Sequence, residues 1–339
     1  MSGSPGATRD GAAPATRPPA AAPSSVPETP PPPGIRSSLR DVVRMAVLVL
    51  VTLLVFYLLF RNVSFSRVFE LLGSARLAPL IAGLLLTATF PVFSAWRWQR
   101  MMDALGHPIP GRQAFSLIMA CNTLAVFTPS KGSDLAKAYF LRGRAPVSTV
   151  LGSVLAERLL DVLTLLAFCL AGSWMRGWNT LALASGGLFV LGLAGTVALL
   201  TIRLPVPRKL RPKVDRLLQA LRLLLGRPAL LAPVLLLTLA NWLASVVQTW
   251  LFYVSLRGPT PFGPVLAALP AAIFVGLLPV TLAGMGTRDA ALIRLMAPVS
   301  ASAVSLGVGI LYSLGGYWLP GILGLPFLRT ALAQRAEGR

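Results

Sequence analysis

Four acidic residues lie inside apolar segments of this sequence: Asp134, Glu157, Asp161 and Asp289. The densest group is in "VLGSVLAERLLDVLTLLAFCL", where Glu157 and Asp161 flank Arg158. If this segment is helical, Glu157 and Asp161 share a face, and Arg158 points about 100° away toward another element. At the centre of a membrane helix each charge costs roughly 2.5–3.5 kcal/mol, whereas a leucine returns only about 0.3–0.6 kcal/mol. The segment therefore has just enough apolar residues to insert, provided that its charges do not face lipid.

Two interpretations of these charges remain open. In the structural one, Glu157, Arg158 and Asp161 pair with charges on neighbouring elements and fix the packing of the helices. In the functional one, they line a polar cavity that holds a ligand, with a carboxylate able to take up a proton. Lys131 and Lys137 have the same two interpretations, as amines that reach the membrane interface or as part of the site.

Two interrupted segments, "FTPSKGSDLAKAYFL" and "LPVTLAGMGTRD", contain Asp134 and Asp289, which are the other two of the four acidic residues. Each segment places proline and glycine beside charge, next to an apolar run. The backbone is expected to break at Pro129, Gly132, Pro279, Gly284 and Gly286. Ser133 and Thr287 are well placed to cap the helix that follows each break. Arg288 and Asp289 adjoin the second break directly, so a solvated loop explains them less well than a site does.

The elements that carry these charges have the composition of membrane helices. The chain is 55% hydrophobic and 12% charged, and its mean hydropathy is +0.72. Apolar runs near the roughly 20 residues needed to cross a bilayer occur at 44–60, 78–96, 114–128, 149–173, 181–202, 229–254, 264–281 and 303–327. The sequence therefore predicts an all-α polytopic membrane protein with about six full spans and two re-entrant broken-helix hairpins, or, as an alternative count, about eight spans.

Basic residues between the runs orient the helices. The segment 203–228 has eight Lys or Arg residues against Asp215 alone, so it is placed in the cytoplasm, together with both termini. The stretch "WRW" at 96–98 has the pattern of an interfacial aromatic belt with a snorkelling Arg97. The 61–77 loop conflicts with this orientation, because it carries three arginines and yet falls outside.

This orientation makes both interrupted segments re-entrant. Counting backward from 203–228, the first break enters and leaves the membrane on the cytoplasmic side. The segment 264–294 likewise enters and leaves from the outer side. The flanking spans run in opposite senses, which is the outline of an inverted repeat. Paired Gly/Pro-interrupted segments in such repeats indicate a binding site near the middle of the membrane.

The ends of the chain differ in composition from its middle. Residues 1–38 are rich in Ala, Pro, Ser and Gly and are expected to form a disordered cytoplasmic tail. A transmembrane domain is expected at 39–330, with a short cytoplasmic tail at 331–339. The formal charge of +20 lies in short loops between apolar runs, which indicates the positive-inside pattern and not nucleic-acid binding. Neither the two cysteines nor His107 has metal-ligand spacing, so no metal or cofactor is expected.

The predicted site favours an anion with hydrocarbon attached. Two helix N-termini facing a shared cavity would present free N–H groups and the positive ends of helix dipoles. Lysine and arginine side chains add positive charge, and the surrounding walls are apolar. A phospholipid or a polyprenyl-phosphate lipid would place its phosphate at the breaks and its tails in the membrane. The residues predicted to bind the headgroup are Lys131, Ser133, Asp134, Lys137, Glu157, Arg158, Asp161, Thr287, Arg288 and Asp289.

At these residues the sequence resembles the lysylphosphatidylglycerol synthase/flippase transmembrane-domain family. The motifs "PSKGSDLAK", "ERLLD" and "LPVTLAGMGTRD" occur in the family's order, within a resemblance that spans residues 40–330. The chain has Asp134 and Asp289 where glutamate is usual, Lys137 where arginine is usual, and Ala283–Gly284 in place of a glycine pair. Some family members translocate an aminoacylated lipid made by an attached synthase domain. No such domain is expected here, so the resemblance implies lipid translocation in a bacterial inner membrane and not lysyl transfer.

Three functions remain open at this point. The first is a flippase-like transporter of an anionic or aminoacylated lipid. The second is an enzyme acting on a lipid-linked substrate, which would need a general base near a nucleophile or metal. The third is a non-transporting membrane subunit that recruits partners through 1–38 and 203–228, although the latter segment would also bind anionic headgroups. Both a homo-oligomer and a complex with a membrane partner are compatible with the sequence.

Overall fold

The computed structural model describes residues 65–127, 133–201, 211–256, 260–277, 284 and 286–337, and the single residues Val47, Leu50, Leu54 and Tyr57. These ranges are predominantly helical and contain no strand, which confirms the all-α class. The expected tail at 1–38 and most of the expected helix at 44–60 lie outside the described residues. So do four of the residues predicted at the breaks or the site, which are Pro129, Lys131, Gly132 and Pro279.

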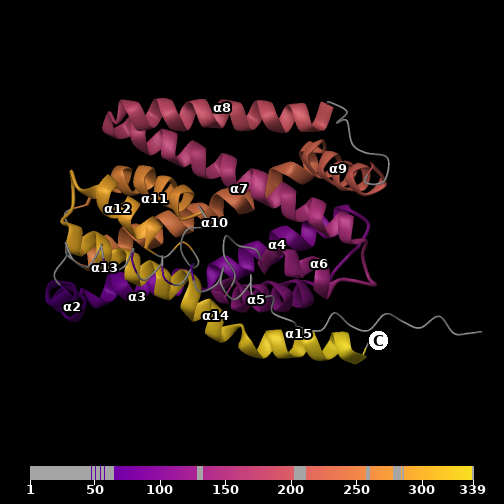
Figure 1. Cartoon of the computed structure of the whole chain (residues 1–339), viewed down its shortest axis with the longest axis horizontal. Coiled ribbons are helices and arrows are strands. Elements are labelled where there is room, and N and C mark those ends of the chain that lie inside the picture. The colour runs from indigo at the N-terminus through magenta and orange to yellow at the C-terminus, as the bar shows by residue number, and fades with distance from the viewer. Residues whose placement is uncertain are drawn as a thin grey trace, which may run out of the picture. The chain divides into compact units, whose positions relative to one another are not determined.

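The helices follow one another with short connections (Figure 1). The first half contains α2 (Phe65–Gly73), α3 (Leu77–Leu86), α4 (Thr89–Ala104), α5 (Gly111–Phe127), α6 (Ala136–Phe140), α7 (Val147–Arg176) and α8 (Asn179–Thr201). The second half contains α9 (Arg211–Leu225), α10 (Pro228–Ser255), α11 (Phe262–Gly276), α12 (Thr287–Met296), α13 (Ser302–Ser313), a π-helical turn (Leu314–Trp318), α14 (Leu319–Leu323) and α15 (Leu325–Glu337).

In the part of the chain that the structure describes, four helical stretches are long and apolar enough to cross a membrane: Leu77–Ala104, Asn179–Thr201, Pro228–Ser255 and Ser302–Ala333. Each overlaps an apolar run that was expected to form a span. Helix α7 has 30 residues and is therefore about 45 Å long, which also exceeds the thickness of the hydrocarbon core. The chain is a polytopic helical membrane protein.

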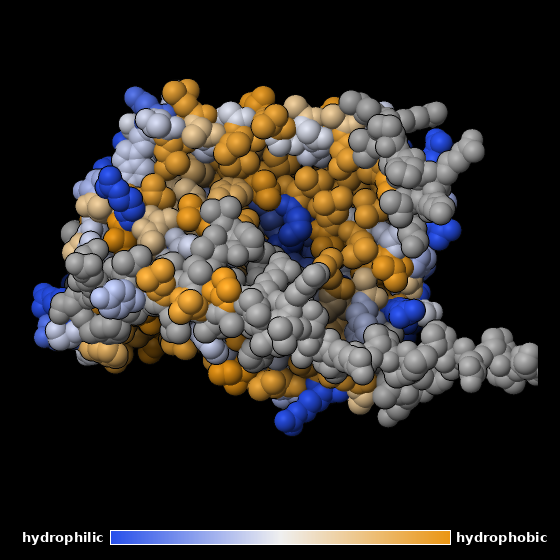
Figure 2. Space-filling model, in the orientation of Figure 1, coloured by the Kyte–Doolittle hydropathy of each residue, from blue (hydrophilic) through white to orange (hydrophobic). Residues whose placement is uncertain are grey.

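Helix α8 has the surface of a lipid-facing span. It packs along α7 and touches α9, while Leu183, Val190 and Leu191 are exposed. Figure 2 shows a largely hydrophobic face, with hydrophilic residues at its edges and at the base of a hollow near its centre. A large exposed apolar surface of this kind marks contact with lipid or with another protein.

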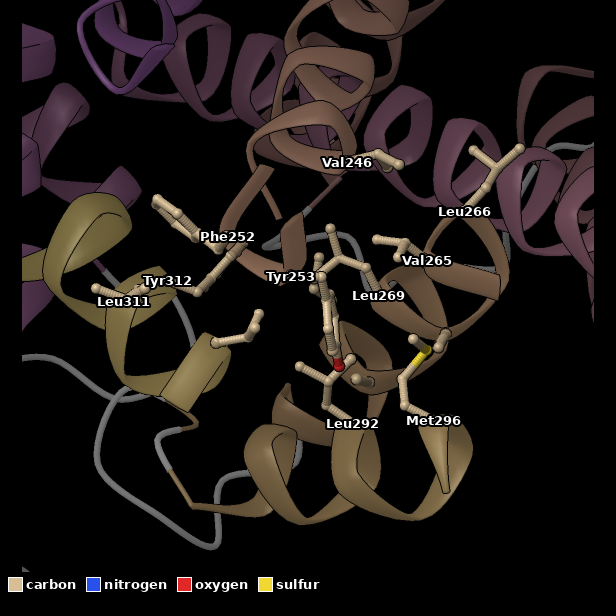
Figure 3. Packing of buried hydrophobic residues seen from close by; sticks show 14 of the residues in the cluster. Val246, Phe252, Tyr253, Val265, Leu266, Leu269, Leu292, Met296, Leu311 and Tyr312 are labelled. Carbon is tan, nitrogen blue, oxygen red and sulfur yellow. The ribbon is translucent and has the colours of Figure 1, made fainter. Parts of the chain in front are cut away.

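An apolar cluster joins α10, α11, α12 and α13 (Figure 3). Phe252 and Tyr253 of α10 meet Leu269 of α11 and Leu292 of α12, and all four side chains are buried. The Tyr253 hydroxyl donates to Ser305 Oγ at 3.2 Å, so its polar atom is satisfied inside the cluster. Lipid tails are as apolar as leucine, so the cluster holds these helices together by close van der Waals contact. It fixes α12 in place, and α12 carries Arg288 and Asp289.

A small residue sets the distance between α7 and α11. A side-chain carbon at Gly172 would overlap the backbone of Leu266 and Ala267, so only glycine permits this approach. Small residues at helix crossings allow such close contact in membranes. The crossing lies near the C-terminal end of α7, away from the charged residues of this helix. It holds that end of α7 against the apolar cluster.

Three segments expected to lie between or after the spans contain helix. The basic segment 203–228 contains the amphipathic helix α9, which buries Leu218, Leu221 and Leu224 against α7 and its neighbours and exposes its arginines. The expected 61–77 loop contains α2, and the expected tail at 331–339 is helical up to Glu337. The basic charge of this segment indicated a loop. Its apolar residues recur at helical spacing between the basic ones, and this spacing is typical of an amphipathic helix.

Candidate functional site

The charged residues near the middle of α7, Glu157, Arg158 and Asp161, form ion pairs within this helix and with other segments. Glu157 and Asp161 are buried and share one face of α7, as their spacing predicted. One guanidinium spans both of them: Arg97 Nη1 lies 2.7 Å from Asp161 Oδ1, and Arg97 Nε lies 3.4 Å from Glu157 Oε1. Arg158 Nη1 lies 3.1 Å from Asp161 Oδ2, and Arg158 Nη2 lies 2.9 Å from Asp134 Oδ2.

The interfacial interpretation of Arg97 is wrong. Arg97 is 4% exposed, and it also donates from Nη1 to Thr238 Oγ1 at 3.1 Å. Its neighbour Trp98 is fully buried and donates to Ser153 Oγ at 3.2 Å. The apolar run ends at residue 96, but α4 continues to Ala104, which places Arg97 well inside a helix. The signal in the sequence was indirect: Glu157 and Asp161 required a buried cation from another segment.

Lys137 of α6 is buried and does not reach the membrane interface. Its Nζ lies 2.5 Å from Glu157 Oε2 and 3.6 Å from Asp134 Oδ1. It also lies 5.1 Å from the centre of the Trp98 ring, close enough for a cation–π interaction. The interfacial explanation of Lys137 is therefore wrong as well. Ser133 begins a short turn that precedes α6, and α6 is preceded by Leu135 with no side-chain cap.

A polar cavity of about 170 Å³ borders this charged cluster. Of the described residues, six charged side chains line it, together with amide, hydroxyl and aromatic groups from α4, α5, α10 and the π-helical turn. Tyr312 and Tyr317 form part of its wall. The charged lining residues are Arg97, Asp134, Lys137, Glu157, Arg158 and Asp161, and Ser133 also contributes. Among the described lining residues, the three cations and three carboxylates balance one another.

Arg288 and Asp289 form a second buried pair at the start of α12. Arg288 Nη2 lies 2.6 Å from Asp289 Oδ1 and donates to Ser313 Oγ at 2.7 Å and to the Gly309 carbonyl at 3.2 Å. Asp289 Oδ2 accepts from the Gly286 N–H at 3.1 Å, so Gly286 precedes the helix and Asp289 caps it.

Thr287 is the first residue of α12, so the expectation that its side chain caps the helix is wrong. Gly284 and Gly286 have φ angles of 70° and 96°, a conformation that favours glycine. The break predicted at these two glycines is therefore supported by the backbone itself.

The second pair lies behind the cavity wall and does not line it. The Arg288 guanidinium is 4.6 Å from the ring centre of Tyr312 and 5.8 Å from that of Tyr317, and both rings face the cavity. The structure thus brings Ser133, Asp134, Lys137, Glu157, Arg158 and Asp161 together around one cavity. It places Gly284, Gly286, Thr287, Arg288 and Asp289 outside the lining. Tyr312 and Tyr317 separate the cavity from the Arg288–Asp289 pair, and no pattern in the sequence indicated this role.

The helical membrane fold and the charged cluster around an internal cavity define an integral membrane protein with a buried polar site. Within that class the chain belongs to the family described as the lysylphosphatidylglycerol synthase TM region, which matches residues 44–324. The match confirms the resemblance seen in the three motifs and spans α2 to α14. No curated protein matches the chain.

Proposed function

We propose that this protein moves a lipid with a phosphate headgroup between the leaflets of the membrane. The substrate would be an anionic or aminoacylated phospholipid or a polyprenyl-phosphate-linked lipid. The single observation that carries the proposal is the exposure of the Arg158 side chain at the cavity. This side chain is 34% exposed, while the other two cations of the cluster are buried. An ionisable side chain inside a membrane domain that faces a cavity is a functional-site hypothesis by default.

The size of the cavity supports a headgroup and excludes a whole lipid. Its volume of about 170 Å³ is several times the ~30 Å³ that a water molecule occupies. It is below the ~300–1,000 Å³ of sites that enclose a small molecule. A headgroup in the cavity would leave its acyl or prenyl chains among the exposed apolar side chains of the helices, as flipping between leaflets requires.

The lengths of two helices support the re-entrant arrangement. Helix α5 has 17 residues and α11 has 15, or about 26 and 23 Å at 1.5 Å per residue, against a hydrocarbon core of about 30 Å. Each is followed by a shorter helix that contacts it, α6 and α12 respectively. We place the two hairpins in opposite halves of an inverted repeat, with both termini in the cytoplasm of a bacterial cell.

Leaflet exchange in reconstituted vesicles tests the proposal. Purified protein is incorporated into liposomes with a fluorescent phosphatidylglycerol, and a membrane-impermeant quencher reports the fraction of probe in the outer leaflet. We expect exchange with the wild type and a loss of at least about tenfold in R158Q, because about 1.4 kcal/mol of lost headgroup binding has that effect. The matched control R100Q changes an exposed arginine on α4 and should stay within about twofold of the wild type.

A non-transporting membrane subunit is the second candidate, because the balanced cluster would also serve as a purely structural crosslink. Wild-type protein that moves neither phosphatidylglycerol nor a polyprenyl-phosphate probe would favour it. Unchanged exchange in R158Q would instead remove the cavity from the mechanism. Mass spectrometry of lipids that co-purify with the protein would separate the substrate classes, and a chemically altered lipid product would point to the enzyme alternative.

A further inference from the structure

Among the residues that the structure describes, every cation of the cavity wall is already paired with a carboxylate. Within the described ranges, each of its six charged side chains takes part in at least one ion pair. The pairs join Arg97, Lys137 and Arg158 to Asp134, Glu157 and Asp161. An anionic headgroup that binds one of these three cations therefore competes with a carboxylate already bound to it.

Glu157 and Asp161 are poorly suited to be replaced. Glu157 is fully buried, with Lys137 Nζ at 2.5 Å. Asp161 is 5% exposed and accepts hydrogen bonds from Arg97 Nη1 at 2.7 Å and Trp242 Nε1 at 2.9 Å. Moving either carboxylate would leave buried charge without compensation.

Asp134 differs from the other two carboxylates in exposure and in its place in the fold. Its side chain is 17% exposed, the largest value among the three carboxylates. Its contact with Lys137 Nζ, at 3.6 Å, is the longest ion pair of the cluster. It lies in the short turn before α6, whereas the other two carboxylates lie within the 30-residue helix α7. A change of side-chain rotamer can therefore move it without disturbing a long helix.

The edge of the Arg158 guanidinium that faces Asp134 carries two N–H donors, of which one is bound to a carboxylate and the other has no acceptor among the described residues. Nη2 lies 2.9 Å from Asp134 Oδ2, while the buried Nε has no hydrogen-bond partner among the residues that the structure describes. The Nε–H and one Nη2–H of a guanidinium point the same way. That edge binds a carboxylate or phosphate with two parallel hydrogen bonds. Nη1 stays engaged with Asp161 on the other side.

We infer that the Asp134 carboxylate occupies the subsite of the headgroup phosphate, and that binding of a phosphate ester displaces it from Arg158. This inference rests on the proposed function. The phosphate takes over the Nη2 donor and gains the Nε donor that Asp134 leaves unused. Asp134 is thus a built-in competitor that sets the affinity for the phosphate group. A headgroup amine would do the opposite, because it would bind Asp134 and depend on its charge.

The two arrangements predict opposite effects of removing the charge. The probe is dihexanoyl phosphatidylglycerol, whose binding to full-length protein in detergent is measured by calorimetry. We expect D134N to bind it about tenfold to a hundredfold more tightly, because the headgroup no longer breaks a hydrogen bond between charged groups. The matched control D103N changes an exposed acid on α4 and should bind as the wild type does.

Unchanged or weaker binding by folded D134N would overturn the inference. Weaker binding of dihexanoyl phosphatidylethanolamine alone would assign Asp134 to the amine. If D134N does not fold, D134S carries the same expectation with a smaller neutral side chain. Binding is measured at equilibrium and needs no transport. Tighter binding in D134N without leaflet exchange would therefore reject the proposed function alone, and exchange without tighter binding would reject this inference alone.

Discussion

Replacing Arg97 by methionine tests whether the buried ion pairs hold α4 against α7. Methionine keeps most of the length of the side chain and removes its charge. Three contacts disappear: Asp161 at 2.7 Å, Glu157 at 3.4 Å and Thr238 at 3.1 Å. Removing one partner of a buried ion pair typically costs about 3–5 kcal/mol. We expect the lower end, about 3 kcal/mol, because Lys137 still pairs with Glu157 and Arg158 with Asp161.

The assay is unfolding in mixed micelles titrated with SDS. Cys121 and Cys169 are 3% and 2% exposed, so a thiol-reactive fluorescent dye reports the fraction unfolded. The matched control R100M removes an exposed arginine that stacks on Trp96 at 5.5 Å, and it should cost less than about 1 kcal/mol. R97K keeps the positive charge but loses the planar set of guanidinium donors. Its loss of stability should fall between those of R97M and R100M.

A double-mutant cycle separates the ion pair from other effects of the change. R97M combined with D161N should be destabilised by less than the sum of the single variants, by about 0.5–3 kcal/mol. The reasoning fails if R97M costs no more than R100M, or if the two changes at the ion pair are additive. Either result would mean that the cluster contributes nothing to the packing of α4 on α7.

Two glycine positions give further predictions in the same titration. A Cβ atom at Gly309 would lie 2.7 Å from Asp289 Oδ1, so G309A should cost about 1–3 kcal/mol, whereas G187A, with open space around it, should be neutral or slightly stabilising. Equal effects of the two would contradict the position of Asp289. G172A should also cost at least about 1–3 kcal/mol because its methyl group meets the backbone of Ala267, and a neutral result would contradict the close crossing of α7 and α11.

The sequence was most informative where local spacing decides the outcome. Glu157 and Asp161 lie four residues apart, and that spacing places them on one face of any helix. Their cost in lipid then required a cavity or buried partners, and the structure has both. The apolar runs likewise predicted the all-α class. A backbone in lipid must satisfy its own hydrogen bonds, and a helix does so within a single segment.

The partners of these residues depend on where helices end and how they pack. Arg97 was assigned to an interface because the apolar run stops one residue earlier, and helix boundaries are the least reliable part of a sequence reading. The separation of Arg288 from the cavity depends on Tyr312 and Tyr317, which lie at the end of α13 and in the π-helical turn. Such turns are rare and have no local pattern that would predict them.

The balanced cluster itself argues for recognition over simple crosslinking. Buried ion pairs are often no more stabilising than apolar side chains of similar volume, because desolvation offsets most of their attraction. Six charges are therefore an inefficient way to hold α4, α6 and α7 together in a membrane. A crosslink also gains nothing from a neighbouring cavity or from an arginine that faces it with one donor unused. Both features are explained if one carboxylate holds the place of a phosphate that comes and goes.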